Sequence, residues 1–253
     1  PGKTHWMSGS LRSCISMILL TLVGVRLVSA QTVPSGFNDA VYISGFDQPV
    51  GFTFDANHRM YVWEKSGKVW IVDTLGVKQS TPLIDISEEV GDWDDHGCLG
   101  FALDPNFLTN GYIYLLYTVD RNYLMNYGKP GYDPAADIYN QATIMRVTRY
   151  TAIGPDLNSV DPASRFVLIG ETKKTGIPVL FTSHSPGSLV FGSDGTLMIT
   201  AGESSNFNGA DVGSDPQTYF AQALTDSSSR PDENVGSLRA QMVNSLSGKV
   251  LRI

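Results

Sequence analysis

The stretch GFALDPN at residues 100–106, followed by YIY at 112–114, decides the fold because the same pattern occurs three times. The other two copies are GFTFDAN (51–57) with MYV (60–62), and SLVFGSDG (188–195) with LMI (197–199). Each copy predicts a strand, a tight turn built on Asp, Asn or Gly, and a second strand. A third strand follows each copy after a variable insertion: KVWIV (68–72), IMRVTRY (144–150) and KVLRI (249–253).

The recurring unit is therefore a small antiparallel sheet, and the fold class is all-β. A single such sheet cannot bury both of its faces, whereas radial stacking of several gives a β-propeller, whose blades recur every ~40 to 50 residues. A β-sandwich would also contain many short strands, but it would not predict the repeated turn. We expect an incomplete N-terminal portion of a β-propeller, because three units do not close a ring.

Composition places the 253 residues among globular proteins, with 42% hydrophobic and 17% charged residues. The formal net charge is −7, and the 18 basic residues form no run. Nucleic-acid partners depend on clustered Lys and Arg, so we expect no nucleic-acid binding.

The N-terminus predicts export. Residues 1–6 precede the first methionine and read as upstream, non-native sequence, while residues 7–30 read as a signal peptide with cleavage after Ala30. The apolar run from Ile15 to Val25 is shorter than the ~20 residues that span a bilayer, so we expect no stable membrane span. The remaining partial propeller, 31–253, carries 15 basic and 25 acidic residues, a net charge of −10, and is expected to be secreted or periplasmic.

Long insertions separate the strands at residues 120–140 and 204–235, and such loops in compact domains are often functional. Residues 234–245 have the spacing of one short helix. Cys98 lies in an apolar run and is expected to be a buried small hydrophobe without a disulfide partner, because Cys14 lies in the signal peptide.

Three histidines fall in the predicted domain. His58 lies in a turn, where exposure is expected. His96 follows three aspartates at 92–95, which would raise its pKa if they are close in space. His184 precedes a strand, and Glu203 ends the strand expected to pair with it, so a hairpin would bring this carboxylate toward His184. A carboxylate that holds one imidazole nitrogen leaves the other as a base.

Two other interpretations of these segments fail. Residues 92–103 match an EF-hand at positions one, three and six, but position twelve is Leu103 and strands flank the segment. Ser185 lacks the Gly-x-Ser-x-Gly pattern of a hydrolase elbow and precedes a strand rather than a helix.

From about residue 43 to 253, the chain resembles the soluble glucose/sorbosone dehydrogenases that depend on pyrroloquinoline quinone (PQQ). The residues that carry the resemblance are QPVGF (48–52), HGCLGFALDPNF (96–107) with GYIY (111–114), His184 with GSLVFGSDG (187–195), and GKVLRI (248–253). The resemblance implies a six-bladed propeller that oxidises aldose sugars by hydride transfer to PQQ. Electrons would then pass to an external acceptor such as a quinone or a cytochrome.

The resemblance also implies roles for three residues. His184 matches the family's general base for the anomeric hydroxyl, and Glu203 stands where the family has an Asp that orients this base. His96 stands where glucose-oxidising members have a Gln that contacts the cofactor. The resemblance places most ligands of PQQ and of a calcium ion beyond Ile253, so no metal ligand is assigned. We expect residues 31–253 alone to be inactive and poorly soluble, with an unpaired strand edge.

Two alternatives remain open, because propellers host many functions. One is a non-catalytic propeller that binds a carbohydrate or a protein, with His184 merely structural. The other is lactone hydrolysis at a channel calcium, which needs several carboxylate or amide ligands; only residues 92–95 form such a cluster.

Overall fold

The computed structural model describes Gly2 and residues 33–253. The chain divides into Pro1–Tyr42 and Ile43–Ile253, and all the described helices and strands lie in the second unit. The predicted upstream residues 1–6, apart from Gly2, and the predicted signal peptide 7–30 lie outside the described residues. Among the residues that are described, no helix is long and apolar enough to cross a membrane.

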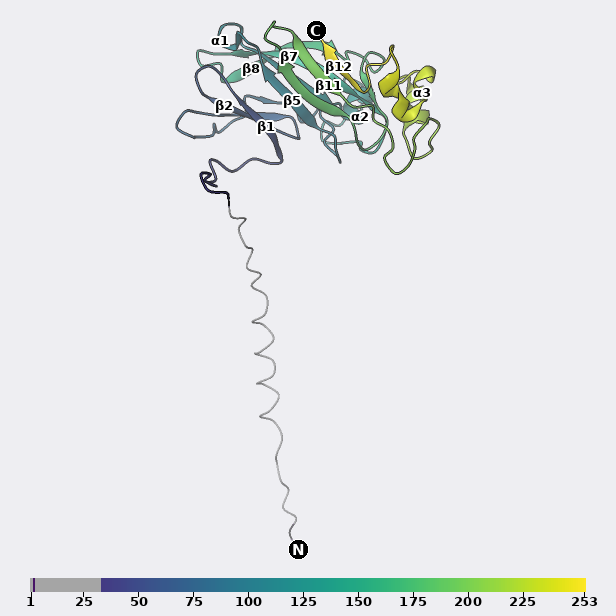
Figure 1. The fold of residues 1–253 in the computed structure, drawn as a ribbon, viewed down its shortest axis with the longest axis horizontal. Coiled ribbons are helices and arrows are strands. Elements are labelled where there is room, and N and C mark those ends of the chain that lie inside the picture. Colours follow the sequence, from purple (N-terminus) through teal and green to yellow (C-terminus); the bar gives the residue numbers. More distant parts are fainter. Residues whose placement is uncertain (1, 3–32) are drawn as a thin grey trace. The chain divides into compact units, whose positions relative to one another are not determined.

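Ile43–Ile253 folds into three antiparallel sheets that follow one another along the chain (Figure 1). Sheet 1 contains β1 (Pro49–Phe54), β2 (Met60–Glu64), β3 (Lys68–Val72) and β4 (Ile84–Asp85). Sheet 2 contains β5 (Cys98–Leu103), β6 (Tyr112–Thr118), β7 (Thr143–Ile153) and β8 (Ser159–Ile169), with β9 (Ile177–Val179) also paired to β7. Sheet 3 contains β10 (Pro186–Phe191), β11 (Leu197–Ala201) and β12 (Lys249–Arg252).

The predicted repeat is confirmed, since each copy forms the first two strands of one sheet and each predicted third strand pairs with the second. The shared aspartate stabilises the turn. Asp55, Asp104 and Asp194 each accept a hydrogen bond from the backbone N–H two residues later, at 2.9, 2.9 and 3.1 Å. In the first two sheets a tyrosine hydroxyl of the next strand, Tyr61 or Tyr114, also donates to this carboxylate. The recurring Asp is therefore a structural residue.

The three sheets pack face to face, with β5 lying beside both β1 and β10. The middle strand β6 shows why this stacking is stable. Its residues Ile113 and Leu115 share a buried cluster with Tyr61 of sheet 1, whereas the alternate residue Leu116 shares another with Ile199 of sheet 3. Successive side chains of a strand point to opposite faces, so one strand serves two interfaces. Stacked sheets of this kind are typical of a propeller, and six blades stay a prediction because three sheets are described.

Apolar side chains also cover the two sheet faces that no other described sheet packs against. On sheet 1 these are Phe52 and Phe54, exposed by 64% and 52%, and on sheet 3 they are Val190 and Val250, exposed by 59% and 65%. Because β12 is also the edge strand of sheet 3, these surfaces support the expected low solubility of residues 31–253, which stays a prediction.

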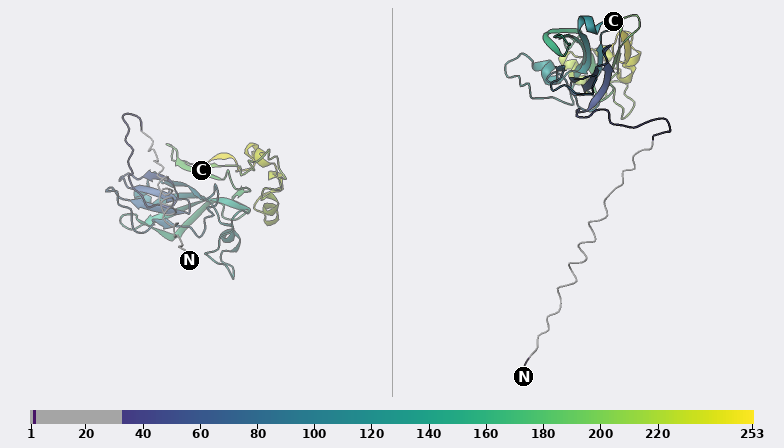
Figure 2. Two further views of the ribbon diagram at one scale, coloured as in Figure 1. Left: turned by 90° about the horizontal axis from the view of Figure 1, so that it is seen from below. Right: turned by 90° about the vertical axis from the view of Figure 1, so that its left-hand side faces the viewer.

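The insertions contain helices that sequence patterns did not reveal. The 120–140 segment includes α2 (Arg121–Asn126) and projects from the sheets (Figure 2). The 204–235 segment includes α3 (Phe220–Asp226), and in place of one predicted helix over 234–245 there is a 3₁₀ helix at Gly236–Gln241. Phe220 of α3 packs on Leu180, a contact distant in sequence. Short helices of this kind depend on tertiary packing rather than on local propensity.

Candidate functional site

The expected contact between His184 and Glu203 is present. His184 lies just before β10 and Glu203 just after β11, and these strands pair so that Pro186 faces Ala201. The Nδ1 atom of His184 lies 2.8 Å from Oε1 of Glu203. A carboxylate accepts only, so Nδ1 carries the proton, and in the neutral ring Nε2 is left as an acceptor. The His184 side chain is 45% exposed, so this acceptor belongs to an accessible ring.

The backbone around the pair is tightly constrained. His184 and Ser204 both have positive φ, at 58° and 55°, and the Ser204 N–H donates to the His184 carbonyl at 2.9 Å. A Cβ at Gly202 would lie 2.0 Å from that carbonyl oxygen, so only glycine fits there. Non-glycine residues in this conformation are strained and are frequent at functional sites, where surrounding contacts hold them.

Ser205 holds the Glu203 carboxylate from the other side. Its Oγ donates to the same Oε1 at 2.6 Å, and the residue is buried. Burial raises the pKa of Glu203, but hydrogen bonds from Ser205 and His184 outweigh burial, so the net shift is below its ordinary value. The carboxylate therefore stays charged and directed at His184.

Arg239 fixes the loop that carries Glu203. Its guanidinium donates to the backbone carbonyls of Glu203 and Ser204, each at 3.0 Å, and of Glu233 at 3.2 Å. Burial lowers the pKa of Arg239. Lys249 likewise donates to three backbone carbonyls, including that of Arg239. Both cations are thus used to hold the backbone.

An exposed aromatic ring flanks His184. Phe207 is 60% exposed, and its ring centre lies 6.4 Å from that of His184 and 5.5 Å from that of Phe181. Sequence patterns had not singled out Phe207, Ser205 or Gly202. The one sequence feature that points to these residues is the long insertion that begins at Ser204: Ser205 and Phe207 lie in it, and Gly202 lies just before it.

His96 lies in the core, with no exposed surface. Its Nε2 is 2.9 Å from the carbonyl oxygen of Phe181, its Nδ1 has no hydrogen-bond partner within the described chain, and the Trp93 ring lies 4.4 Å away. Burial lowers the pKa of His96 to about 4. Asp95 does raise the pKa of His96, as expected of a nearby carboxylate, but loss of hydration outweighs it, so the net shift is downward.

Among the described residues, no hydrogen bond joins His96 to His184. Phe181 links their surroundings indirectly, since its carbonyl accepts from His96 and its ring packs on Phe207, which flanks His184. The expected contact of His96 with a cofactor stays a prediction that this geometry does not test.

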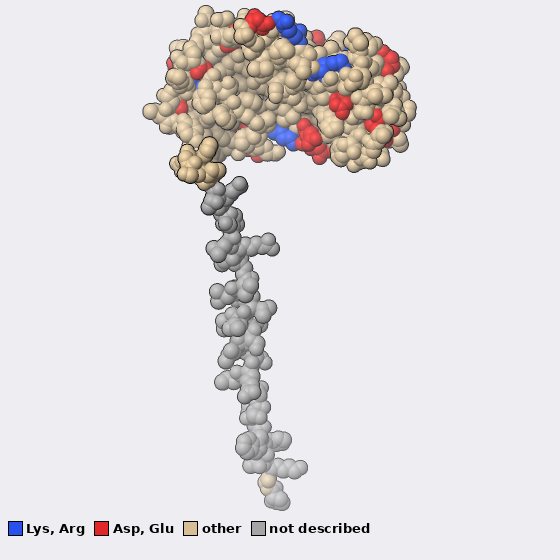
Figure 3. Space-filling model, in the orientation of Figure 1, with Lys and Arg blue, Asp and Glu red and all other residues tan. Residues whose placement is uncertain are grey.

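Other candidate residues occupy structural positions. Cys98 is buried as expected, and burial raises the pKa of its thiol to about 12. His58 is exposed in its turn, as expected. Over the described residues, no group of three or more His, Cys, Asp or Glu could hold a metal ion. On the face shown in Figure 3, charged side chains are scattered.

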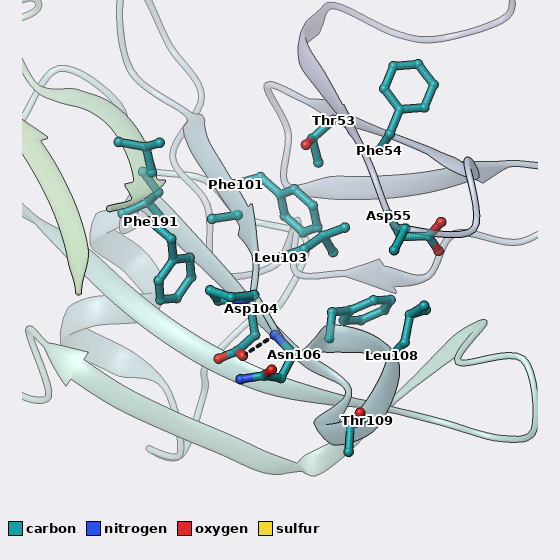
Figure 4. Close-up of a pocket in the computed structure, with 16 residues that line it drawn as sticks. Thr53, Phe54, Asp55, Phe101, Leu103, Asp104, Asn106, Leu108, Thr109 and Phe191 are labelled. Carbon is teal, nitrogen blue, oxygen red and sulfur yellow. Dashed lines mark hydrogen bonds between the residues drawn. The ribbon is translucent and has the colours of Figure 1, made fainter. Parts of the chain in front are cut away.

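A cavity of about 450 Å³ lies at the C-terminal ends of β1, β5 and β10 (Figure 4). It is lined by the last residues of β1, β5 and β10, whereas His96 and His184 precede the first residues of β5 and β10. Its Asp55 and Asp104 carboxylates are already bonded within their turns. This cavity is therefore separate from the His184 site.

Comparisons with known proteins agree with this fold. The family model described as Glucose / Sorbosone dehydrogenase matches residues 46–253. The structure of the PQQ-bound form of aldose sugar dehydrogenase from Streptomyces coelicolor is 20% identical, with a TM-score of 0.53 over 85% of this chain and 46% of that chain. At this identity the likeness shows a shared fold.

Curated relatives include the Hedgehog-interacting proteins of Mus musculus and Homo sapiens. Each is 29% identical over 167 residues, which cover 64% of this chain and 21% of the relative. The chain thus spans about a fifth of the length of these relatives and under half of that of the Streptomyces enzyme.

Proposed function

The chain belongs to the glucose/sorbosone dehydrogenase family, and on this basis we propose that it is part of an exported quinoprotein that oxidises the anomeric hydroxyl of an aldose sugar. The hydrogen-bonded pair of His184 and Glu203 is the observation that carries the proposal. The Streptomyces structure, which its title describes as a PQQ-bound aldose sugar dehydrogenase, supports the substrate class and the cofactor.

The pair suits the removal of a hydroxyl proton. Oxidation of a C–OH group to C=O removes the hydroxyl proton and a hydride from carbon; PQQ, when bound, supplies the two-electron acceptor. His184 takes the hydroxyl proton on Nε2, while Nδ1–H remains bonded to Glu203. The negative carboxylate stabilises the imidazolium that forms, as a buried Asp does in hydrolase triads.

The described residues fit the cofactor only in part. They provide a base and an adjacent aromatic ring, Phe207, but the PQQ carboxylates need cations, and both Arg239 and Lys249 are bonded to backbone carbonyls. Residues for these carboxylates and for calcium are therefore not assigned. The proposed contact of His96 with the cofactor rests on the family resemblance alone. His96 has no exposed surface among the described residues and is bonded to the Phe181 carbonyl, so this contact would require the ring to be uncovered.

The test is dye reduction by the complete protein with a panel of aldoses, with and without PQQ and calcium. We expect turnover that requires PQQ, and a fall of about 10²- to 10⁴-fold in His184→Ala. His58→Ala, which changes an exposed turn histidine, is the matched control and should retain activity. Substantial turnover by folded His184→Ala protein would show that His184 is not the general base.

A second candidate is a non-catalytic domain that binds a protein or a carbohydrate. The similarity to proteins named for interaction with Hedgehog, over 64% of this chain, favours it. It predicts a folded complete protein that neither turns over aldoses nor changes tryptophan fluorescence on addition of PQQ.

Export and the electron acceptor complete the proposal. We expect the secreted protein to begin at Gln31, which N-terminal sequencing would show. A quinone or a cytochrome, tested in place of the dye, should accept the electrons.

A further inference from the structure

A second cavity, of about 510 Å³, lies between the outer strands of sheets 1 and 2. Its walls come from the segment around β4, from α2 with the residues after it, from Tyr150 of β7 and from the first half of β8. It shares no residue with the His184 site or with the cavity of Figure 4. Its volume is within the ~300 to 1,000 Å³ of small-molecule sites.

One wall is aromatic and comes from the tyrosine-rich 120–140 insertion. Tyr123 and Tyr127 are stacked, with ring centres 4.4 Å apart and 24° between their planes, and both line the cavity. The Tyr132 ring meets Tyr127 edge-on at 5.6 Å. Tyr127 remains 58% exposed although two rings hold it in place. A fixed, exposed aromatic ring offers a ready surface for the C–H face of a ligand.

The floor is polar and held by a buried ion cluster. Glu89 is buried, and its Oε1 accepts from Tyr117 Oη at 2.5 Å, from Arg165 Nη2 at 2.8 Å and from Arg146 Nη1. The Arg165 side chain is 28% exposed and lines the cavity. At the rim, exposed Glu88 accepts a hydrogen bond from Tyr132 at 3.0 Å. The cavity thus presents a guanidinium, which only donates hydrogen bonds, beside carboxylates, which only accept them.

The charges around the cavity nearly cancel. Two guanidiniums, Arg146 and Arg165, stand against the carboxylates of Asp85, Glu88 and Glu89. A strongly charged ligand of either sign would be repelled by a side chain of the same sign. A hydroxyl group can both donate and accept, so it suits either kind of partner. A neutral, hydroxyl-rich ring with an apolar C–H face matches the floor and the aromatic wall together.

We propose that this cavity binds one sugar ring of a neutral carbohydrate, at a site separate from His184. Tyr127 stacks on the C–H face of the ring, Arg165 donates to its hydroxyls and Glu88 accepts from them. The site would hold a carbohydrate beside the outer strands β4 and β8, whether or not the chain oxidises sugars.

The experiment is calorimetric titration of the complete protein with methyl glycosides of glucose, galactose, xylose and N-acetylglucosamine. These probes have no free anomeric hydroxyl, so they are not substrates of the proposed oxidation. We expect binding of at least one probe, weakened by about tenfold or more in Tyr127→Ala and largely retained in Tyr127→Phe. Phe166→Ala, which removes another exposed ring outside the cavity, should bind as the unchanged protein does.

The His184→Ala protein separates this proposal from the proposed function. Retained glycoside binding in His184→Ala, with loss in Tyr127→Ala, supports the cavity whatever the dehydrogenase assay shows. Loss in His184→Ala with retention in folded Tyr127→Ala would place the sugar elsewhere and overturn the proposal. An absence of binding for every probe up to about 50 mM, well above the millimolar range expected for one sugar ring, would also overturn it.

Discussion

His184 and Glu203 are joined by a hydrogen bond of 2.8 Å although they lie 19 positions apart in the sequence. The β10–β11 pairing brings them together, and Gly202, Ser205 and Arg239 hold them there. Substitutions at the residues that hold the pair should therefore change its pKa values or the stability of the protein.

Replacing Glu203 by glutamine should lower kcat by about 10²-fold or more if the complete protein oxidises aldoses, because the neutral amide cannot stabilise the imidazolium of His184. The pH dependence of kcat should shift with it. Glu171→Gln, at an exposed position, is the control. An unchanged pH profile in Glu203→Gln would show that this carboxylate does not act on the base.

Removing the Ser205 hydroxyl should raise the pKa of Glu203 toward its ordinary value of 4.5, because Ser205 stabilises the charged form. A lowered pKa in the folded state contributes stability above the ordinary pKa, and this contribution is lost as pH falls through the lowered value. Ser205→Ala should therefore lose the contact of Glu203 with His184 at a higher pH. Titration of the Glu203 carboxyl carbon by ¹³C NMR measures this. In the control Ser188→Ala, which alters an exposed serine on β10, Glu203 should titrate as in the unchanged protein.

Gly202→Ala should destabilise the protein by about 1 to 3 kcal/mol and displace His184, because the new Cβ would meet the His184 carbonyl oxygen. Thermal melting shows the loss of stability. Gly209→Ala, in the insertion that follows Glu203, is a matched control, since a Cβ there meets nothing within 4 Å. Equal melting temperatures for the two variants would contradict the close approach.

Glu89→Gln should cost about 3 to 5 kcal/mol in the free energy of unfolding, because it leaves the buried Arg146 without its charge partner. Urea denaturation measures this loss. The neighbouring exposed Glu88→Gln should change stability by less than about 0.5 kcal/mol. A stable Glu89→Gln protein would mean that the ion cluster does not stabilise the fold.

The sequence predicted the features that depend on local pattern. The alternation of apolar residues and the repeated Asp turn placed all nine strands of the three repeated units, because a strand with one buried face needs period two and a tight turn needs residues that accept turn N–H groups. The contact between His184 and Glu203 followed from the same hairpin, since antiparallel pairing fixes which residues face each other.

Tertiary structure decided the rest. The aspartates before His96 suggested a raised pKa if they lay close to the ring, yet the ring is fully buried beside Trp93 and the Phe181 carbonyl, and burial lowers its pKa to about 4. The helix α3, the support of Glu203 by Arg239 and the cavity beside Tyr127 all require contacts between segments far apart in the chain. Such contacts leave no period in the sequence, because burial depends on which surfaces meet after the sheets have stacked.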